Sequence, residues 1–202
     1  MRLGLYGGSF DPVHYGHLLL AECARETLSL DEVWLIPAAV PPHKQTRELA
    51  PAKHRLAMLE LALAGHEQIK SSQLEINRGG ISYTVDTLAA VHEQYSSANI
   101  FLLMGADSLH DLPTWREPQQ ICELATVAVV RRGGSPEPDF SVLTPITSAK
   151  NLIAIRASQV QMPLIELSST DLRHRAATGQ SLRYRTPRAV EKYIETHSLY
   201  RT

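Results

Sequence analysis

The sequence RLGLYGGSFDPVHYGHLLLAE, residues 2–22, joins an apolar run to a helical pattern through a short loop that contains glycine and proline. Residues 2–7 have the composition of a β-strand. The apolar residues that follow recur at helical spacing, which predicts a helix over about 16–29. A strand that leads directly into a helix is the repeating unit of an α/β chain.

Further β-rich runs and helical patterns alternate along the rest of the chain. We predict strands at 32–37, 71–76, 99–105 and 125–132, helices at 52–65 and from about Thr84, and two final helices. The runs at 99–105 and 125–132 are almost wholly apolar, as is typical of buried parallel strands. The expected fold is α/β, a Rossmann-like doubly wound parallel sheet with helices on both faces.

Composition and charge limit the class of protein. The 202 residues suffice for one sizeable domain, and 44% hydrophobic and 20% charged residues are ordinary for a globular protein. We expect a single domain over 1–202, with a surface loop at 133–151 and with about 151–202 completing the same domain. The net charge of −1 argues against a nucleic-acid or membrane partner.

Cys23 and Cys122 are the only cysteines, and we expect both to be buried in apolar surroundings. Two thiols make neither a disulfide framework nor a cysteine-rich zinc site. The N-terminal residues show no apolar signal region, and no apolar run reaches spanning length. A cytoplasmic protein, monomer or homodimer, is the expectation.

The loop after the first strand has the composition of a phosphate site. Gly7 and Gly8 allow tight turning and close approach of the backbone, and the helix start offers unpaired N–H groups. The stretch is not G-x-G-x-x-G and contains no G-K-[ST], which argues against a dehydrogenase or a P-loop NTPase. His14 and His17 lie on one side of the helix entrance, because residues three apart are neighbours.

The histidine pair has three possible roles. Zinc ligation lacks a convincing third ligand, and the H-E-x-x-H form is absent. A lone histidine is more often a structural hydrogen-bonding group. Two histidines beside a glycine-containing loop at a strand end favour phosphate contact instead.

A second motif, LSSTDLR, lies about 150 residues downstream at 167–173. Ser168 and Asp171 have capping-box spacing, so Ser168 is expected to cap a helix whose second turn carries Arg173. An amide-rich helix start beside an arginine forms a cradle for pyrophosphate.

Together the two motifs resemble the nucleotidyltransferase superfamily, whose H-x-G-H signature is HYGH here. The segments PAAVPPHK, ISYTVDTL, MGADSLHDLPTWRE and SLRYRTPRAVEKYI look like bacterial nicotinate mononucleotide adenylyltransferases over nearly the whole chain. The resemblance implies transfer of the adenylyl group of ATP to nicotinate mononucleotide, giving nicotinate adenine dinucleotide and pyrophosphate in NAD biosynthesis.

The resemblance also implies roles for individual residues. The implied catalytic residues are His14, His17, Lys44 and Arg173. The implied ATP-binding residues are Gly8, Ser9, Phe10, His14, His17, Gly105, Asp107, Ser168, Ser169, Thr170 and Arg173. The implied mononucleotide-binding residues are Gly8, Ser9, Lys44, Tyr83, Thr84, Trp115 and Arg132. Mg²⁺ would be held mainly by the ATP phosphates, without a protein metal site.

Elementary chemistry supports several of these roles beside simpler ones. Lys44 could reach phosphate or remain solvated. Thr84 could cap its helix, or the helix start could hold the nicotinate carboxylate. Trp115 could stack on a pyridinium ring or anchor its loop to the core. Asp107 could accept hydrogen bonds from ribose hydroxyls or cap a helix.

Two positions depart from the family pattern, and several alternatives stay open. Arg116 stands where a residue that helps enclose the nicotinate is expected, and Ala39 where some relatives carry asparagine. Arg131 and Arg132 are candidate partners of the mononucleotide phosphate. The alternatives are nicotinamide mononucleotide or another phosphate acceptor, a non-catalytic nucleotide sensor, and an RNA-binding relative of the class I synthetases, which the net charge opposes.

Overall fold

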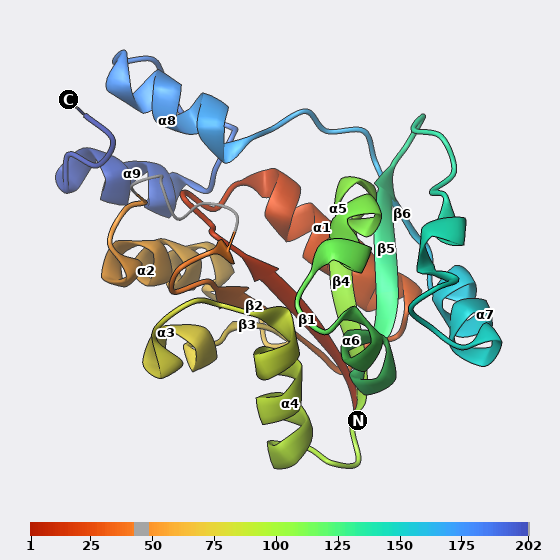
Figure 1. Cartoon of the computed structure of the whole chain (residues 1–202). Helices are drawn as coiled ribbons and strands as arrows, with labels where there is room; N and C mark the ends of the chain where they lie inside the picture. Colours follow the sequence, from red (N-terminus) through yellow and green to blue (C-terminus); the bar gives the residue numbers. More distant parts are fainter. Residues whose placement is uncertain (43–48, 202) are drawn as a thin grey trace.

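The computed structural model describes residues 1–42 and 49–201 (Figure 1). Within these residues six parallel strands form one sheet in the order β3-β2-β1-β4-β5-β6. The strands are β1 (Arg2–Gly8), β2 (Glu32–Pro37), β3 (Ile69–Ser71), β4 (Asn99–Gly105), β5 (Thr126–Arg132) and β6 (Val160–Met162). This strand order is that of a doubly wound fold, so the expected fold class is confirmed.

Helices connect the strands and cover both faces of the sheet (Figure 1). The α-helices are α1 (Tyr15–Thr27), α2 (Ala52–Leu63), α3 (Leu74–Arg78), α4 (Thr84–Gln94), α5 (Ala106–Asp111), α6 (Pro118–Leu124), α7 (Ala149–Ala157), α8 (Ser169–Ala177) and α9 (Arg188–Thr196), with 3₁₀ turns η2 (Leu112–Thr114) and η3 (Phe140–Leu143). The last helix, α9, packs against α2, which brings the end of the chain back beside its first third (Figure 1).

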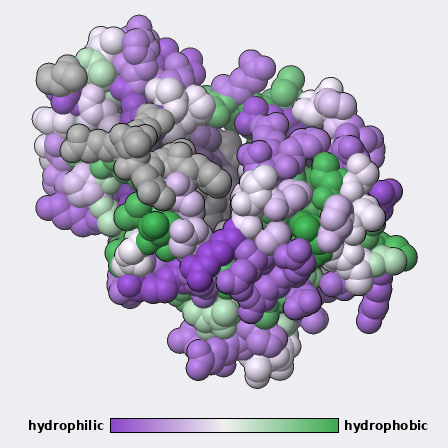
Figure 2. All heavy atoms as spheres, viewed as in Figure 1, coloured by the Kyte–Doolittle hydropathy of each residue, from purple (hydrophilic) through white to green (hydrophobic). Residues whose placement is uncertain are grey.

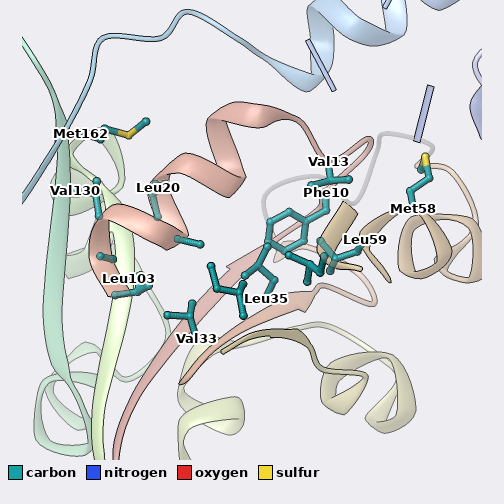
Figure 3. Packing of buried hydrophobic residues seen from close by; sticks show 14 of the residues in the cluster. Phe10, Val13, Leu20, Val33, Leu35, Met58, Leu59, Leu103, Val130 and Met162 are labelled. Carbon is teal, nitrogen blue, oxygen red and sulfur yellow. The ribbon is translucent and has the colours of Figure 1, made fainter. Parts of the chain in front are cut away.

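The described buried side chains form two hydrophobic clusters, one on each face of the sheet. Leu102 and Leu103 are successive residues of β4 and belong to opposite clusters, because strand side chains alternate between faces. Figure 3 shows the cluster in which Leu20 of α1 and Leu59 of α2 pack against the sheet. The second cluster is covered mainly by α4, α6 and α7.

The third strand is displaced from its expected position. Residues 69–71 pair with β2, whereas most of the predicted strand 71–76 lies in the turn before α3 and in α3 itself. The side chain of Ile69 reaches the first core cluster, which favours the earlier register. Glu75 of α3 is buried and accepts a 2.6 Å hydrogen bond from the Thr87 hydroxyl, so α3 is fixed against α4.

The segment after β5 also differs from the expectation. The surface loop predicted at 133–151 contains η3 and runs into α7, which includes residues 152–155. The edge strand β6 is residues 160–162, because these pair with the end of β5 from Val130 onward. Residues 163–167, the PLIEL segment, then leave the sheet toward α8.

Figure 2 shows a mostly hydrophilic face on which hydrophobic residues form small groups. Among the described residues, no helix combines the length and apolar character that crossing a bilayer requires. Cys122 is buried as expected, but Cys23 is only half-buried, so that expectation is wrong for Cys23.

Candidate active site

A cavity of about 870 Å³ opens at the carboxyl ends of β1, β4 and β5. After β1 the chain moves toward β2, and after β4 it moves toward β5, so the cavity lies at the topological switch point where doubly wound sheets bind ligands. The residues that the sequence indicated and that line it are Gly8, Ser9, His14, His17, Tyr83, Thr84, Gly105, Asp107, Trp115, Arg132, Ser168, Ser169, Thr170 and Arg173.

Lys44, Phe10 and Arg131 were indicated by the sequence but are not among the described lining residues. Lys44 lies outside the described residues. Phe10 is 1% exposed, packs in the first core cluster and does not line the cavity. Gly7 and Gly8, which were expected to allow tight turning, are the last residues of β1, and the left-handed backbone of the loop is at Phe10, with φ 44°.

The two histidines stand at the entrance of α1 as the spacing predicted. His14 is the N-cap residue and His17 is the third residue of the helix, and their rings stack with centroids 3.7 Å apart. The backbone N–H of His14 donates a 3.2 Å hydrogen bond to Nδ1 of His17, which leaves the proton of the neutral His17 ring on Nε2. A Cβ at Gly16 would lie 3.0 Å from the His14 ring, so this position favours glycine.

Burial determines the charge of His14. The side chain is 6% exposed, and burial together with the positive charge of Arg132 lowers the pKa of His14 to about 4. His14 is therefore neutral at pH 7. A neutral imidazole can donate one hydrogen bond to an anionic oxygen without contributing a charge of its own.

The second motif forms the start of α8. The Ser168 hydroxyl accepts a 3.1 Å hydrogen bond from the Asp171 N–H, which confirms Ser168 as the helix cap. Arg173 lies in the second turn, and its Nη2 donates to the Thr170 hydroxyl at 2.9 Å. The arginine is thereby held along the helix surface that faces the cavity.

Hydrogen bonds join this helix to the first loop. The Ser169 hydroxyl donates to the Pro12 carbonyl at 2.9 Å, and Nη1 of Arg173 donates to the Asp11 carbonyl. Two motifs about 150 residues apart in the sequence thus form one surface. Backbone N–H groups of a helix start, an arginine and two histidines converge there, which is a set of donors suited to phosphate.

The cavity is also lined by Tyr83, Thr84 and Trp115, which were expected to bind the mononucleotide. Thr84 is the first residue of α4 and Tyr83 takes the cap position, so Thr84 does not cap the helix. Trp115 is half-buried against the second core cluster and also lines the cavity, so it anchors its loop while one surface remains available. The Arg116 guanidinium lies 4.8 Å from the Tyr83 ring centroid and 3.6 Å from the Asp86 carboxylate.

The remaining candidates separate in the structure. Arg132 lines the cavity. Arg131, the preceding residue of β5, does not, and it pairs with Glu137 at 3.2 Å. Asp107 is exposed in the first turn of α5, whose cap position is Gly105, so Asp107 does not cap that helix.

Sequence reasoning missed a buried arginine beneath the first loop. Arg55 is 1% exposed and donates hydrogen bonds to the carbonyls of Ala50 (2.9 Å), Ser9 (3.0 Å) and Ala39 (3.4 Å). Its spacing three residues before the buried Met58 could have indicated that it lies on the inner face of α2.

The contact between Asp11 and Tyr200 was also not predicted from the sequence. Asp11 is 1% exposed, and its carboxylate accepts a 2.7 Å hydrogen bond from the Tyr200 hydroxyl. Asp11 belongs to the quoted loop, where a charge between Phe10 and Pro12 was the available signal. No local pattern identifies Tyr200, which lies 189 residues away from Asp11.

Comparisons with known proteins show the family to which the chain is similar. A family model described as cytidylyltransferase-like matches residues 5–175. A Thermomicrobium roseum protein called "Probable nicotinate-nucleotide adenylyltransferase" is 45% identical over 201 residues, which cover 100% of this chain and 92% of the relative. A Thermus thermophilus protein of the same name is 43% identical, with 100% of both chains covered.

Solved structures share the fold. The Plasmodium falciparum nicotinic acid mononucleotide adenylyltransferase, solved in complex with NaAD, superposes with a TM-score of 0.78 at 19% identity, covering 98% of this chain and 97% of the other. Because the family model spans most of the chain and relatives match its full length, the chain belongs to the cytidylyltransferase-like family and, within it, to the nicotinate-nucleotide adenylyltransferases.

Proposed function

We propose that this cavity transfers the adenylyl group of ATP to nicotinate mononucleotide, releasing pyrophosphate and forming nicotinate adenine dinucleotide. The observation that carries the proposal is the meeting of His14, His17 and Arg173 at the sheet switch point. These groups supply donors and positive charge where the triphosphate of ATP would lie.

The chemistry needs alignment and charge stabilisation more than an activated side chain. The acceptor phosphate is already a nucleophile at pH 7, so in-line attack on the α-phosphate depends on holding both substrates in register. The Nε2–H of His17 and the neutral ring of His14 would donate to α-phosphate oxygens. Arg173 would neutralise the departing pyrophosphate, and the same role stays a prediction for Lys44.

The acceptor site would lie on the other side of the cavity. The start of α4 at Thr84 offers N–H groups and the positive end of the helix dipole to a carboxylate. Trp115 would support the pyridinium ring by stacking and cation–π attraction. A neutral carboxamide gains little from the helix dipole, which favours the acid form of the mononucleotide.

A divalent cation, Mg²⁺ in this proposal, would accompany ATP. Across residues 1–42 and 49–201 no group of three or more His, Cys, Asp or Glu side chains could hold a metal ion. The described residues of the cavity therefore fit an ion whose ligands are mainly ATP phosphates and water. Such an ion, when bound, neutralises charge on the phosphate oxygens. A cytoplasmic location and a monomer or homodimer remain part of the proposal.

The test compares acceptors and variants by pyrophosphate release. We expect kcat/KM to be higher with nicotinate mononucleotide than with nicotinamide mononucleotide, because only the acid carries a carboxylate. His17→Ala should lower kcat by about two to three decades, since a lost donor to a transition-state oxyanion costs roughly 3–4 kcal/mol.

The matched control is His92→Ala, because His92 is exposed on α4 and does not line the cavity. It should retain wild-type activity. Equal kcat/KM values for acid and amide would contradict the acceptor assignment. A His17→Ala enzyme with kcat within a few-fold of the wild type would contradict the phosphate role.

A further inference from the structure

We propose that Asp11 and Tyr200 form a buried positioning unit that holds Arg173 and the first loop in the arrangement that adenylyl transfer requires. The inference rests on the proposed function and adds residues that touch neither substrate. Neither Asp11 nor Tyr200 is among the described residues that line the cavity. Both would therefore act through Arg173 and the loop backbone.

Asp11 is the centre of the unit. Its carboxylate accepts hydrogen bonds from the Tyr200 hydroxyl at 2.7 Å and from the Ala50 N–H at 3.3 Å, and it lies 3.7 Å from Nη1 of Arg173. The same Nη1 donates to the Asp11 backbone carbonyl. A carboxylate that is 1% exposed is tolerated only when it is paired and hydrogen bonded, so these contacts fix its position.

A second buried charge lies below the same loop. Arg55 donates to the Ser9 carbonyl at 3.0 Å, and the negative charge of Asp11 partly offsets the lowering of the Arg55 pKa by burial. Arg55 and Arg173 thus each donate a hydrogen bond to a backbone carbonyl of residues 9–11, Arg55 to Ser9 and Arg173 to Asp11. The negative charge of Asp11 offsets both cations: it lies 3.7 Å from Nη1 of Arg173, and it raises the pKa of Arg55 against the effect of burial.

Tyr200 completes the unit from the far end of the chain. Burial and the adjacent Asp11 carboxylate raise the pKa of the Tyr200 hydroxyl, which keeps it protonated and able to donate. The hydroxyl bonds the Oδ1 atom, while Arg173 approaches Oδ2. Loss of the hydroxyl would remove the shorter of the two hydrogen bonds to Oδ1 described above and leave the 3.3 Å bond from Ala50, so the carboxylate beside Arg173 would be less firmly positioned.

The test is Tyr200→Phe, which removes one oxygen and retains the ring. We expect kcat to fall about tenfold while the KM for nicotinate mononucleotide stays unchanged, because small misplacements of phosphate-binding groups cost up to about a hundredfold. Asp11→Asn should lower kcat further, since it removes the charge that faces Arg173. All assays are made well below the melting temperature of each variant, with the folded fraction checked by circular dichroism.

Tyr193→Phe is the matched control. The Tyr193 hydroxyl lies 3.0 Å from Nδ1 of His54, so its polar contact joins α9 to α2 and does not involve Asp11. It should lower stability without lowering kcat. Tyr200→Phe with wild-type kcat, or with kcat lowered no more than in Tyr193→Phe, would overturn the inference. An inactive wild-type protein would instead contradict the proposed function.

Discussion

At the scale of single residues, the histidine pair combines a local arrangement with an environment that only the fold creates. The i, i+3 spacing places both rings at one helix entrance, and the hydrogen bond from His14 N–H to His17 Nδ1 orients the second ring. The neutrality of His14 comes from burial and from Arg132, which lies on a strand more than a hundred residues later.

This environment predicts a pH-dependent stability. The pKa of His14 is about 4 in the folded protein and 6.5 without its environment, so in the interval between them the unfolded chain binds more protons. The contribution of neutral His14 to the free energy of unfolding is fully present above pH 6.5. It is lost as the pH falls toward 4, and the loss is at most about 3 kcal/mol. Urea unfolding at pH 7 and pH 4.5 measures the loss.

Two variants isolate the contribution of His14. His14→Gln should show a smaller loss of stability between pH 7 and pH 4.5, because the titrating group is gone. Arg132→Gln should raise the pKa of His14, which an NMR titration of the imidazole protons follows. A His14→Gln variant with the wild-type pH dependence would show that other groups are responsible.

At the scale of elements, the loop between β1 and α1 is held by segments from the end of the chain. The Thr186 hydroxyl donates to the Val13 carbonyl at 2.7 Å, and the Tyr15 N–H donates to the Arg185 carbonyl at 3.1 Å. Together with the Ser169 contact from α8, these bonds satisfy loop groups that would otherwise be left unpaired. The C-terminal segment therefore helps to hold the loop whose residues line the cavity.

Helix caps allow stability and function to be separated. Ser168 caps α8 and Ser148 caps α7, each accepting from a backbone N–H at 3.1 Å. Replacing either serine by alanine should cost about 1 kcal/mol of stability. Only Ser168→Ala should also raise the KM for ATP, because Ser148 does not line the cavity. Thermal unfolding and steady-state kinetics test this, and an equal effect of both variants on KM would refute the difference.

At the scale of the whole molecule, the C-terminal residues enter the same core as the N-terminal half. Val160, Leu172 and Val190 pack in one cluster with Leu35 and Met58. The edge strand β6 extends the sheet, and α9 packs on α2. These contacts support a single cooperative domain over 1–202, which stays a prediction until unfolding is measured.

Leu172→Ala tests that cooperativity. Leu172 is fully buried on α8, so its truncation should cost about 2–5 kcal/mol. The two tryptophans, Trp34 and Trp115, both lie before residue 151. In a single domain, tryptophan fluorescence and circular dichroism should report the same lowered midpoint. A fluorescence midpoint that stays at the wild-type value would indicate that about 151–202 unfold separately.

Features that depend on neighbouring residues could be predicted from the sequence alone. Apolar periodicity predicted the alternation of strands and helices. The i, i+3 spacing predicted that the two histidines lie side by side, and the capping-box spacing of Ser168 predicted the start of α8. Each of these signals acts within one turn or one strand. The common ligand site of the two motifs was implied by their joint resemblance to the nucleotidyltransferase superfamily, because no local spacing links segments about 150 residues apart.

Features that depend on residues far apart in the chain could not be predicted from local patterns, because they are set by the packing of the folded protein. Pairing with β2 and core packing placed the third strand at 69–71, because a short apolar run fits several registers. The roles of Asp11, Arg55 and Tyr200 follow from burial, and burial is set by helices packed across the loop from far along the chain. A charge that would be solvated in isolation becomes structural when the fold removes water and supplies its opposite charge.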